Sequence, residues 1–258
     1  MKILLGISFT FISCIGIAQE VETVYSDLTG KTWMAKNLGA ESIATSITDD
    51  SSFGDLYQWG RRKDGHQLRN SAITTLLSNS TNPNHSLFIL GSSNWMVNQI
   101  DDLWQESNGI NNPCPQGFRL PTEQEFEAER NTWTSNNAEG AFNSPLKLSI
   151  GGARSRMSGQ IGNVGTFVGY RTSTINGDKV RLFGVSLSDS FMGSRDRADG
   201  NCIRCIKDEP LSLDESTQSS KKLIKIIDVL GRESDKISNK ILFYIYDDGS
   251  AMKRIIAD

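Results

Sequence analysis

Hydrophobic residues fall into short runs separated by polar loops, a pattern typical of short strands rather than long helices. The runs 21–25 and 31–38 are joined by Asp27-Leu28-Thr29-Gly30, whose Asp and Gly favour a reversal, so we expect a hairpin there. From residue 39 to 113 no period persists, and such a stretch is ordered only when a scaffold holds it. Further strands are predicted at 146–150, 170–173, 180–187 and 202–206.

One segment carries a clear signal for the start of a helix. Thr122 can cap the first free amide groups while Glu125 reaches back to the cap. Phe126 and Trp133 are seven residues apart and would share one helical face, which predicts a helix of about three turns. Strands and loops around one such helix indicate an α+β fold with few helices.

The N-terminus has the pattern of a secretory signal peptide. Lys2 precedes an almost wholly apolar run at 3–17, which is too short for a span of about 20 residues. Small residues before Gln19 predict cleavage between Ala18 and Gln19, so that residues 1–18 are removed. Two alternatives are an uncleaved membrane anchor and a lipoprotein attached through Cys14.

Composition narrows the class of protein. The chain has 258 residues, of which 37% are hydrophobic, and 23 glycines, which suits a loop-rich extracellular fold. A net charge of −3 provides no basic field, so nucleic acid is not an expected partner. Beyond the signal no apolar stretch approaches membrane-spanning length, and we expect no transmembrane segment in the mature chain.

The C-terminal part differs from the rest. Residues 209–220 hold almost nothing to bury and are expected to form a linker. After them, the runs 223–230, 241–246 and 252–256 are apolar and β-branched, with a turn expected at Asp247-Asp248-Gly249. Residues 221–258 should therefore form a small separate β module.

Five ordered motifs between residues 21 and 208 resemble the Fibrobacter succinogenes major paralogous domain. They are GKTWMAKNL at 30–38, GDLYQWG at 54–60, NPCPQGFRLPT at 112–122, GYRTS at 169–173 and IRCIKD at 203–208. The segment around Leu120-Pro121-Thr122 also resembles formylglycine-generating enzymes, which share a C-type-lectin-like fold. The resemblance implies that residues 19–208 form a lectin-like domain of twisted antiparallel strands with long loops.

The same resemblance bears on the cysteines. Formylglycine-generating enzymes use a reactive cysteine pair with copper, but the context of Cys205 is similar to their structural Arg-Cys segment. The resemblance thus implies a disulfide between Cys114 and Cys205, with Cys202 left over and no catalytic residue. A redox Cys-x-x-Cys pair, or a zinc site completed by His66 or His85, stays open as an alternative.

Other candidate chemistry is weak. Lectin-like folds commonly bind calcium, yet no recognisable calcium loop is present. Carboxylates that could contribute to calcium binding are Asp27, Asp49, Asp50, Asp55, Asp189, Asp196 and Asp199, and solvated turn carboxylates are the plainer interpretation. Most of the five tryptophans are expected in the core, although a sugar-stacking platform is an alternative.

The tail at 221–258 resembles the sorting module of type IX secretion cargo, which implies the type IX machinery as a partner. A small hairpin that packs on the main domain is the alternative. We therefore expect a secreted or cell-surface, non-enzymatic binding protein, whose ligand, carbohydrate or another molecule, the sequence does not identify. An oxidase of formylglycine-generating ancestry and a structural envelope component are the competing hypotheses.

Overall fold

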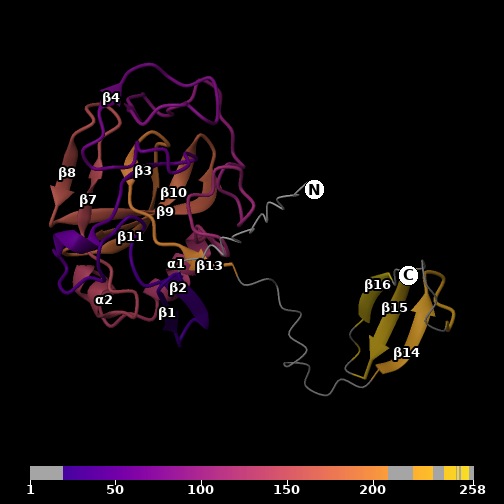
Figure 1. Ribbon diagram of the computed structural model, residues 1–258. Helices are drawn as coiled ribbons and strands as arrows, with labels where there is room; N and C mark the ends of the chain where they lie inside the picture. Colours follow the sequence, from indigo (N-terminus) through magenta and orange to yellow (C-terminus); the bar gives the residue numbers. More distant parts are fainter. Residues whose placement is uncertain (1–19, 209–222, 235–240, 248, 250, 256–258) are drawn as a thin grey trace, which may run out of the picture. The chain divides into compact units, whose positions relative to one another are not determined.

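The computed structural model describes residues 20–208, 223–234, 241–247, 249 and 251–255 (Figure 1). The chain divides into two compact units, Met1–Asp208 and Glu209–Asp258, and each is described by itself. The predicted signal peptide 1–18, the cleavage site at Ala18 and Gln19, and the predicted linker 209–220 lie outside the described residues.

The first unit contains a four-stranded sheet in the order β1-β2-β13-β6, with antiparallel neighbours. Its strands are β1 (Thr23–Ser26), β2 (Lys31–Met34), β6 (Phe118–Arg119) and β13 (Ile206–Lys207). The predicted N-terminal hairpin is confirmed, and Gly30 makes its reversal with a φ of +66°. Its second strand ends at Met34 rather than at residue 38, because beyond it single backbone bonds, from Ala35 to Glu22 and from Leu38 to Ile203, replace the ladder.

A seven-stranded mixed sheet forms the rest of the scaffold, in the order β11-β10-β9-β7-β12-β3, with β8 paired to β7. Its strands are β3 (Tyr57–Gln58), β7 (Gly151–Arg154), β8 (Ile161–Val164), β9 (Phe167–Asn176), β10 (Lys179–Ser186), β11 (Ser190–Arg195) and β12 (Gly200–Asn201). Outside it lie the parallel pair β4 (Ile73–Thr74) and β5 (Phe88–Ile89), the 3₁₀ turn η1 (Asp50–Ser52), and helices α1 (Glu123–Arg130) and α2 (Ala138–Asn143). The architecture is thus α+β, with few helices and long loops (Figure 1).

Strands β9 and β10 lie between two hydrophobic clusters. Tyr170 and Phe183 contribute to one cluster, where Phe126 of α1 lies 5.0 Å from Phe183 between ring centroids. Val180 contributes to the other, which also contains Trp59 and Cys205. Because burial of one large apolar side chain contributes about 1.5–3 kcal/mol, these clusters hold loops that have little secondary structure of their own.

Helix α1 begins as predicted but is shorter. Thr122 accepts from the Glu125 N–H at 3.2 Å, and Glu125 accepts from the Thr122 N–H at 2.8 Å, which confirms the capping box. The helix spans 8 residues, about two turns, and the prediction of three was wrong. The Thr132 hydroxyl donates to the Glu129 carbonyl just past the end, a local bond that competes with helix continuation. Trp133 therefore lies beyond the helix, although it still packs on Phe183.

Two predicted strands were wrong in detail. Apart from the exposed Lys147 the 146–150 run is buried, but its N–H groups bond outside any ladder, from Leu148 to Ala141 and from Ile150 to Ile47, and the strand starts at Gly151. The 202–206 run is not one strand, because Cys202 bridges to β9 whereas its other end belongs to β13. This run instead connects the two sheets of the first unit.

The second unit is an antiparallel sheet of β14 (Leu223–Asp228), β15 (Ile241–Tyr246) and β16 (Ala251–Ile255), which confirms the three predicted strands. Leu242, Tyr244 and Tyr246 alternate into its small core. The first strand ends at Asp228 rather than at residue 230, because the Asp228 carboxylate accepts from the N–H groups of the following turn. Gly249 has a φ of +80° and donates to the Tyr246 carbonyl, as expected of a turn, and Asp248 lies outside the described residues.

Candidate functional site

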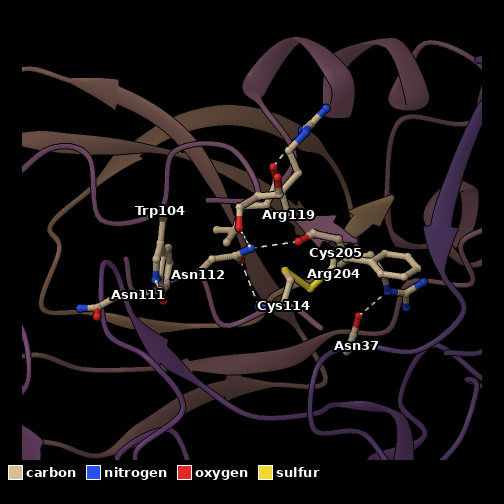
Figure 2. The surroundings of a disulfide bond; sticks show 11 residues. Asn37, Trp104, Asn111, Asn112, Cys114, Arg119, Arg204 and Cys205 are labelled. Carbon is tan, nitrogen blue, oxygen red and sulfur yellow. Dashed lines mark hydrogen bonds between the residues drawn. A yellow bond between two sulfur atoms is a disulfide. The ribbon is translucent and has the colours of Figure 1, made fainter. Parts of the chain in front are cut away.

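Cys114 and Cys205 form a disulfide, as the resemblance implied (Figure 2). The two cysteines are 91 residues apart in sequence, and their Cα atoms lie 6.0 Å apart. Asn112 orients the loop end of this bond, since its side chain accepts from the Cys114 N–H at 3.1 Å and donates to the Phe118 carbonyl at 2.9 Å. The bond therefore fastens the loop before β6 to the segment that enters β13.

The third cysteine of the described chain is poorly suited to chemistry. Cys202 is 1% exposed, and its thiol donates to the Phe53 carbonyl at 3.4 Å. Burial raises the pKa of Cys202 to about 11, so the nucleophilic thiolate is scarce at neutral pH. Because Cys205 is bonded to Cys114, the redox pairing of Cys202 with Cys205 is not formed.

The histidines do not form a zinc site. His66 is buried and accepts from the Gln58 N–H through Nε2 at 3.1 Å, so its Nδ1–H donates to Asp64 at 2.6 Å. Burial lowers the pKa of His66 to about 4, which keeps the ring neutral while both nitrogens are engaged. His85 accepts from the Leu87 N–H. Among the described residues no group of three or more His, Cys, Asp or Glu could hold a metal ion.

The candidate calcium carboxylates are dispersed. Asp49 caps η1, and hydrogen bonds from Ser51 and Thr45 lower its pKa to about 2. Asp196 and Asp199 both pair with Arg156. The exposed Asp27 and Asp189 lie in separate hairpin connections, whereas two others, Asp50 and Asp55, line one cavity. A shared calcium site is not assembled by these seven carboxylates.

A cavity that contains Asp55 lies among the loops of the first unit. We call it the Asp55 cavity; its volume is about 460 Å³, and its lining is Gly39, Ala40, Glu41, Asp50, Ser51, Gly54, Asp55, Leu68, Arg69 and Asn70. Two glycines with positive φ shape it, Gly39 at +85° and Gly54 at +70°. A Cβ on Gly39 would lie 2.3 Å from the Asp55 carboxylate, so only a glycine at position 39 allows the loop to approach Asp55 this closely.

Asp55, which lines this cavity, is held in an unusual state. Asp55 is only 9% exposed, and no described residue donates a hydrogen bond to its carboxylate or forms an ion pair with it within 4.0 Å. Burial raises the pKa of Asp55 to about 6, although the charges of Lys63 and Arg69 oppose this rise. Near neutral pH, Asp55 therefore offers a partly desolvated carboxyl group with free acceptor capacity.

Arg69 lines the same cavity and also keeps hydrogen-bonding capacity in reserve. Its Nε donates to the Gly54 carbonyl at 2.7 Å and its Nη1 to the Gly151 carbonyl at 2.9 Å, while the plane lies over the Phe53 ring. Its Nη2 is buried without a hydrogen-bond partner among the described residues. Arg69 thus brings a positive charge to the lining of the cavity, and this charge favours the ionised form of Asp55.

Buried arginines hold several loops of the first unit in place. A guanidinium group has five donors, enough to satisfy carbonyls that a loop leaves unpaired. Arg204 donates to the side chain of Asn37 (Figure 2) and to the carbonyls of Met34 and Leu146. Asn37 in turn donates to the Ser52 carbonyl. Other buried arginines with backbone carbonyl acceptors are Arg61, Arg154, Arg171 and Arg197.

In the part of the chain that the structure describes, the tryptophan side chains do not form an exposed platform. Trp33, Trp59, Trp95 and Trp104 are buried, as expected, and Trp133 is partly buried against Phe183.

Sequence reasoning named Asp55 as a candidate but missed its neighbour Arg69. The glycines at 39 and 54, on either side of a short irregular segment, were the available signal for a close loop approach.

In comparisons with known proteins, no family model, no curated protein and no solved structure matches this chain. The candidate site therefore depends on its own geometry. In the part of the chain that the structure describes, no helix is long and apolar enough to span a membrane.

Proposed function

We propose that this chain is an exported, non-enzymatic binding protein of the cell surface or the extracellular space, and that the Asp55 cavity holds its polar ligand. The observation that carries the proposal is Asp55 itself, a nearly buried carboxyl group to which no described residue donates a hydrogen bond, in a cavity that Arg69 also lines. A fold stabilises such groups poorly by itself, since a buried polar group without a hydrogen bond costs about 1–3 kcal/mol. A polar ligand that donates hydrogen bonds would satisfy the Asp55 carboxyl group.

The state of the cysteines favours binding over catalysis. The competing oxidase needs an available reactive pair, whereas two of the three cysteines after Ala18 are joined to each other and Cys202 is buried and protonated. This supports a stapled binding scaffold of the lectin-like type that the sequence motifs resemble.

Export is supported by both ends of the sequence. The apolar run at 3–17 resembles a signal peptide, and the three-stranded second unit fits a compact sorting module for type IX secretion. Within this proposal the second unit serves delivery, and the first unit binds.

Binding by the mature chain can be tested on an array of saccharides and peptides with three variants. Asp55→Asn removes the acceptor charge, and Gly39→Ala directs a methyl group into the Asp55 carboxylate. Gly165→Ala is the matched control, because Gly165 also has a positive φ, +76°, but its new Cβ would meet nothing closer than Thr48 at 3.8 Å. We expect Asp55→Asn and Gly39→Ala to weaken binding about ten-fold or more, since a hydrogen bond to a charged group contributes about 1.5–3 kcal/mol.

A second readout separates the cavity from general loss of structure. Binding by the wild type should change between pH 5 and pH 7.5, because Asp55 titrates with a pKa of about 6, whereas binding by Asp55→Asn should not change. Binding that survives both cavity variants, or that is lost equally in Gly165→Ala, contradicts the proposed site. The structural envelope alternative predicts no saturable binding at all.

A further inference from the structure

A second cavity lies on the seven-stranded sheet, away from the residues of the Asp55 cavity. We call it the Asn201 cavity; its volume is about 290 Å³. Strands β7, β8 and β12 and the ends of β9 and β11 supply its walls, and its lining is Ala153, Arg154, Ser155, Gln160, Ile161, Gly162, Asn163, Phe167, Arg195, Asp199 and Asn201. Because most of these residues belong to paired strands, their positions are fixed before any ligand arrives.

Asn201 is the buried polar group of this cavity. It is 1% exposed, and its Nδ2 has no hydrogen-bond partner among the described residues. Gly169 permits this position, since a Cβ there would lie 2.5 Å from the Asn201 Oδ1. Buried amide groups are nearly always paired, so an unpaired donor in a cavity wall indicates a ligand that accepts hydrogen bonds.

The exposed rim has the same unpaired polar character. Gln160, Asn163 and Arg195 reach the surface, and none of their side chains has a hydrogen bond or ion pair with another described residue. Two amides and a guanidinium group therefore face one small cavity, and the amides can both donate to and accept from hydroxyl groups.

The charge of the cavity is positive once the internal pairs are taken into account. Asp199 shares Arg156 with Asp196, at 3.6 Å and 3.1 Å, whereas the two arginines of the lining, Arg154 and Arg195, have no acidic partner among the described residues. Behind the Asp199 backbone lies the fully buried Arg171, whose Nε and Nη1 also lack acceptors among the described residues. An anionic oxygen is the ligand group that this arrangement favours, and a guanidinium group binds a carboxylate through two parallel bonds.

An aromatic ring completes the cavity. Phe167 is partly exposed in the lining, and it stacks on Phe191 with 6.3 Å between ring centroids. A ring fixed in this way offers an apolar face to the C–H groups of a sugar, beside the polar groups that would bind its hydroxyls.

We propose that the Asn201 cavity binds a saccharide that carries a carboxylate. Arg195 receives the carboxylate, Asn201 donates to a ring or hydroxyl oxygen, and the sugar face lies on Phe167. This site is independent of the Asp55 cavity, and neither site requires the other to be correct.

The test uses trigalacturonate and its methyl ester, which share a skeleton and differ in charge. Amide chemical shifts of the ¹⁵N-labelled mature chain locate the bound sugar. Trigalacturonate should shift the resonances of Gly162, Asn163 and Asn201, and the ester should bind about ten-fold or more weakly because the charge-assisted bonds to Arg195 are lost. Arg195→Gln should reduce the affinity for trigalacturonate by a similar factor.

The matched control is Lys179→Gln. Lys179 is exposed on β10, next to Val180, which pairs with Arg195, so this variant removes one positive charge without changing the cavity. We expect its affinity to stay within about two-fold of the wild type, because Lys179 and Val180 are adjacent on one strand, which places the Lys179 side chain on the opposite face of the sheet from Val180 and its partner Arg195. Equal binding of acid and ester, equal loss in both variants, equivalent shifts with inorganic sulfate alone, or no shift at the three amides would each overturn the proposal.

Discussion

Removal of the Cys114–Cys205 disulfide should destabilise the first unit strongly, and the structure sets the size of the effect. The bond closes a segment with a sequence separation of 91. In the chain-entropy model, a loop of this length contributes about 4–5 kcal/mol, because the bond restricts the unfolded chain. For a unit of this size, 1 kcal/mol corresponds to about 2–4 °C in melting temperature, so the loss should be about 8–20 °C.

The variant for this test is Cys114→Ala/Cys205→Ala. Changing both cysteines avoids a free Cys205 close in sequence to Cys202, and alanine avoids placing a hydroxyl group at the fully buried position 205. Thermal unfolding of the oxidised mature chain, followed by near-ultraviolet circular dichroism, gives the melting temperature. Reduction should bring the wild type to the level of the variant and leave the variant unchanged.

Cys202→Ser is the control, because its hydroxyl can still donate to the Phe53 carbonyl that the thiol reaches now. We expect a cost of about 1 kcal/mol from the more polar group in a buried position. The reasoning fails if Cys202→Ser melts as low as the double variant. It also fails if the double variant melts within about 3 °C of the wild type, because this would correspond to a loss of less than 1–2 kcal/mol in the free energy of unfolding.

Three further predictions follow from other parts of the chain. Asp55 has a pKa of about 6 in the folded state against an ordinary 3.8, so the folded state holds this proton more tightly and the free energy of unfolding should fall as the pH rises from about 4 to 6. Urea unfolding should show no such fall for Asp55→Asn. The difference in free energy of unfolding between this variant and the wild type should therefore be about 2–3 kcal/mol larger in favour of the variant at pH 7.5 than at pH 4. Thr122→Ala should cost about 1 kcal/mol in thermal unfolding, because the Glu125 N–H loses its acceptor. A periplasmic fluorescent reporter that ends in residues 207–258 should leave a host with type IX secretion, whereas one that stops at Lys207 should stay inside. Gly249→Val should impair this export, because a β-branched residue is strained at a φ of +80°, and equal retention of all reporters would reduce the second unit to a structural hairpin.

Local signals in the sequence were sufficient for some elements. The capping box at Thr122 and the reversal at Gly30 were predictable because a few adjacent residues determine each of them. The short apolar run of β15, rich in β-branched and aromatic residues, likewise identified a strand. In each case the signal and the structure involve the same short segment.

The errors arose where distant residues decide the local structure. The 146–150 run has the composition of a strand, yet its N–H groups bond to Ala141 and Ile47, which no local pattern announces. For the same reason the Asp55 cavity could not be predicted. The proximity of Asp55 to Arg69 depends on carbonyls at Gly54 and Gly151, and the latter is 82 residues from Arg69.

The pairing of β2 with β13 also constrains when this protein can fold. Trp33 of β2 lies opposite Ile206 of β13, and the Met34 N–H bonds to the Cys205 carbonyl, so the first sheet joins opposite ends of its unit (Figure 1). A segment that emerges early from a translocation channel must therefore wait for almost the whole unit before its hairpin gains a neighbour on the β13 side. Such long-range closure makes folding slow. For a chain that folds after export, as we propose, it also delays the completed sheet until nearly all of the first unit has crossed the membrane.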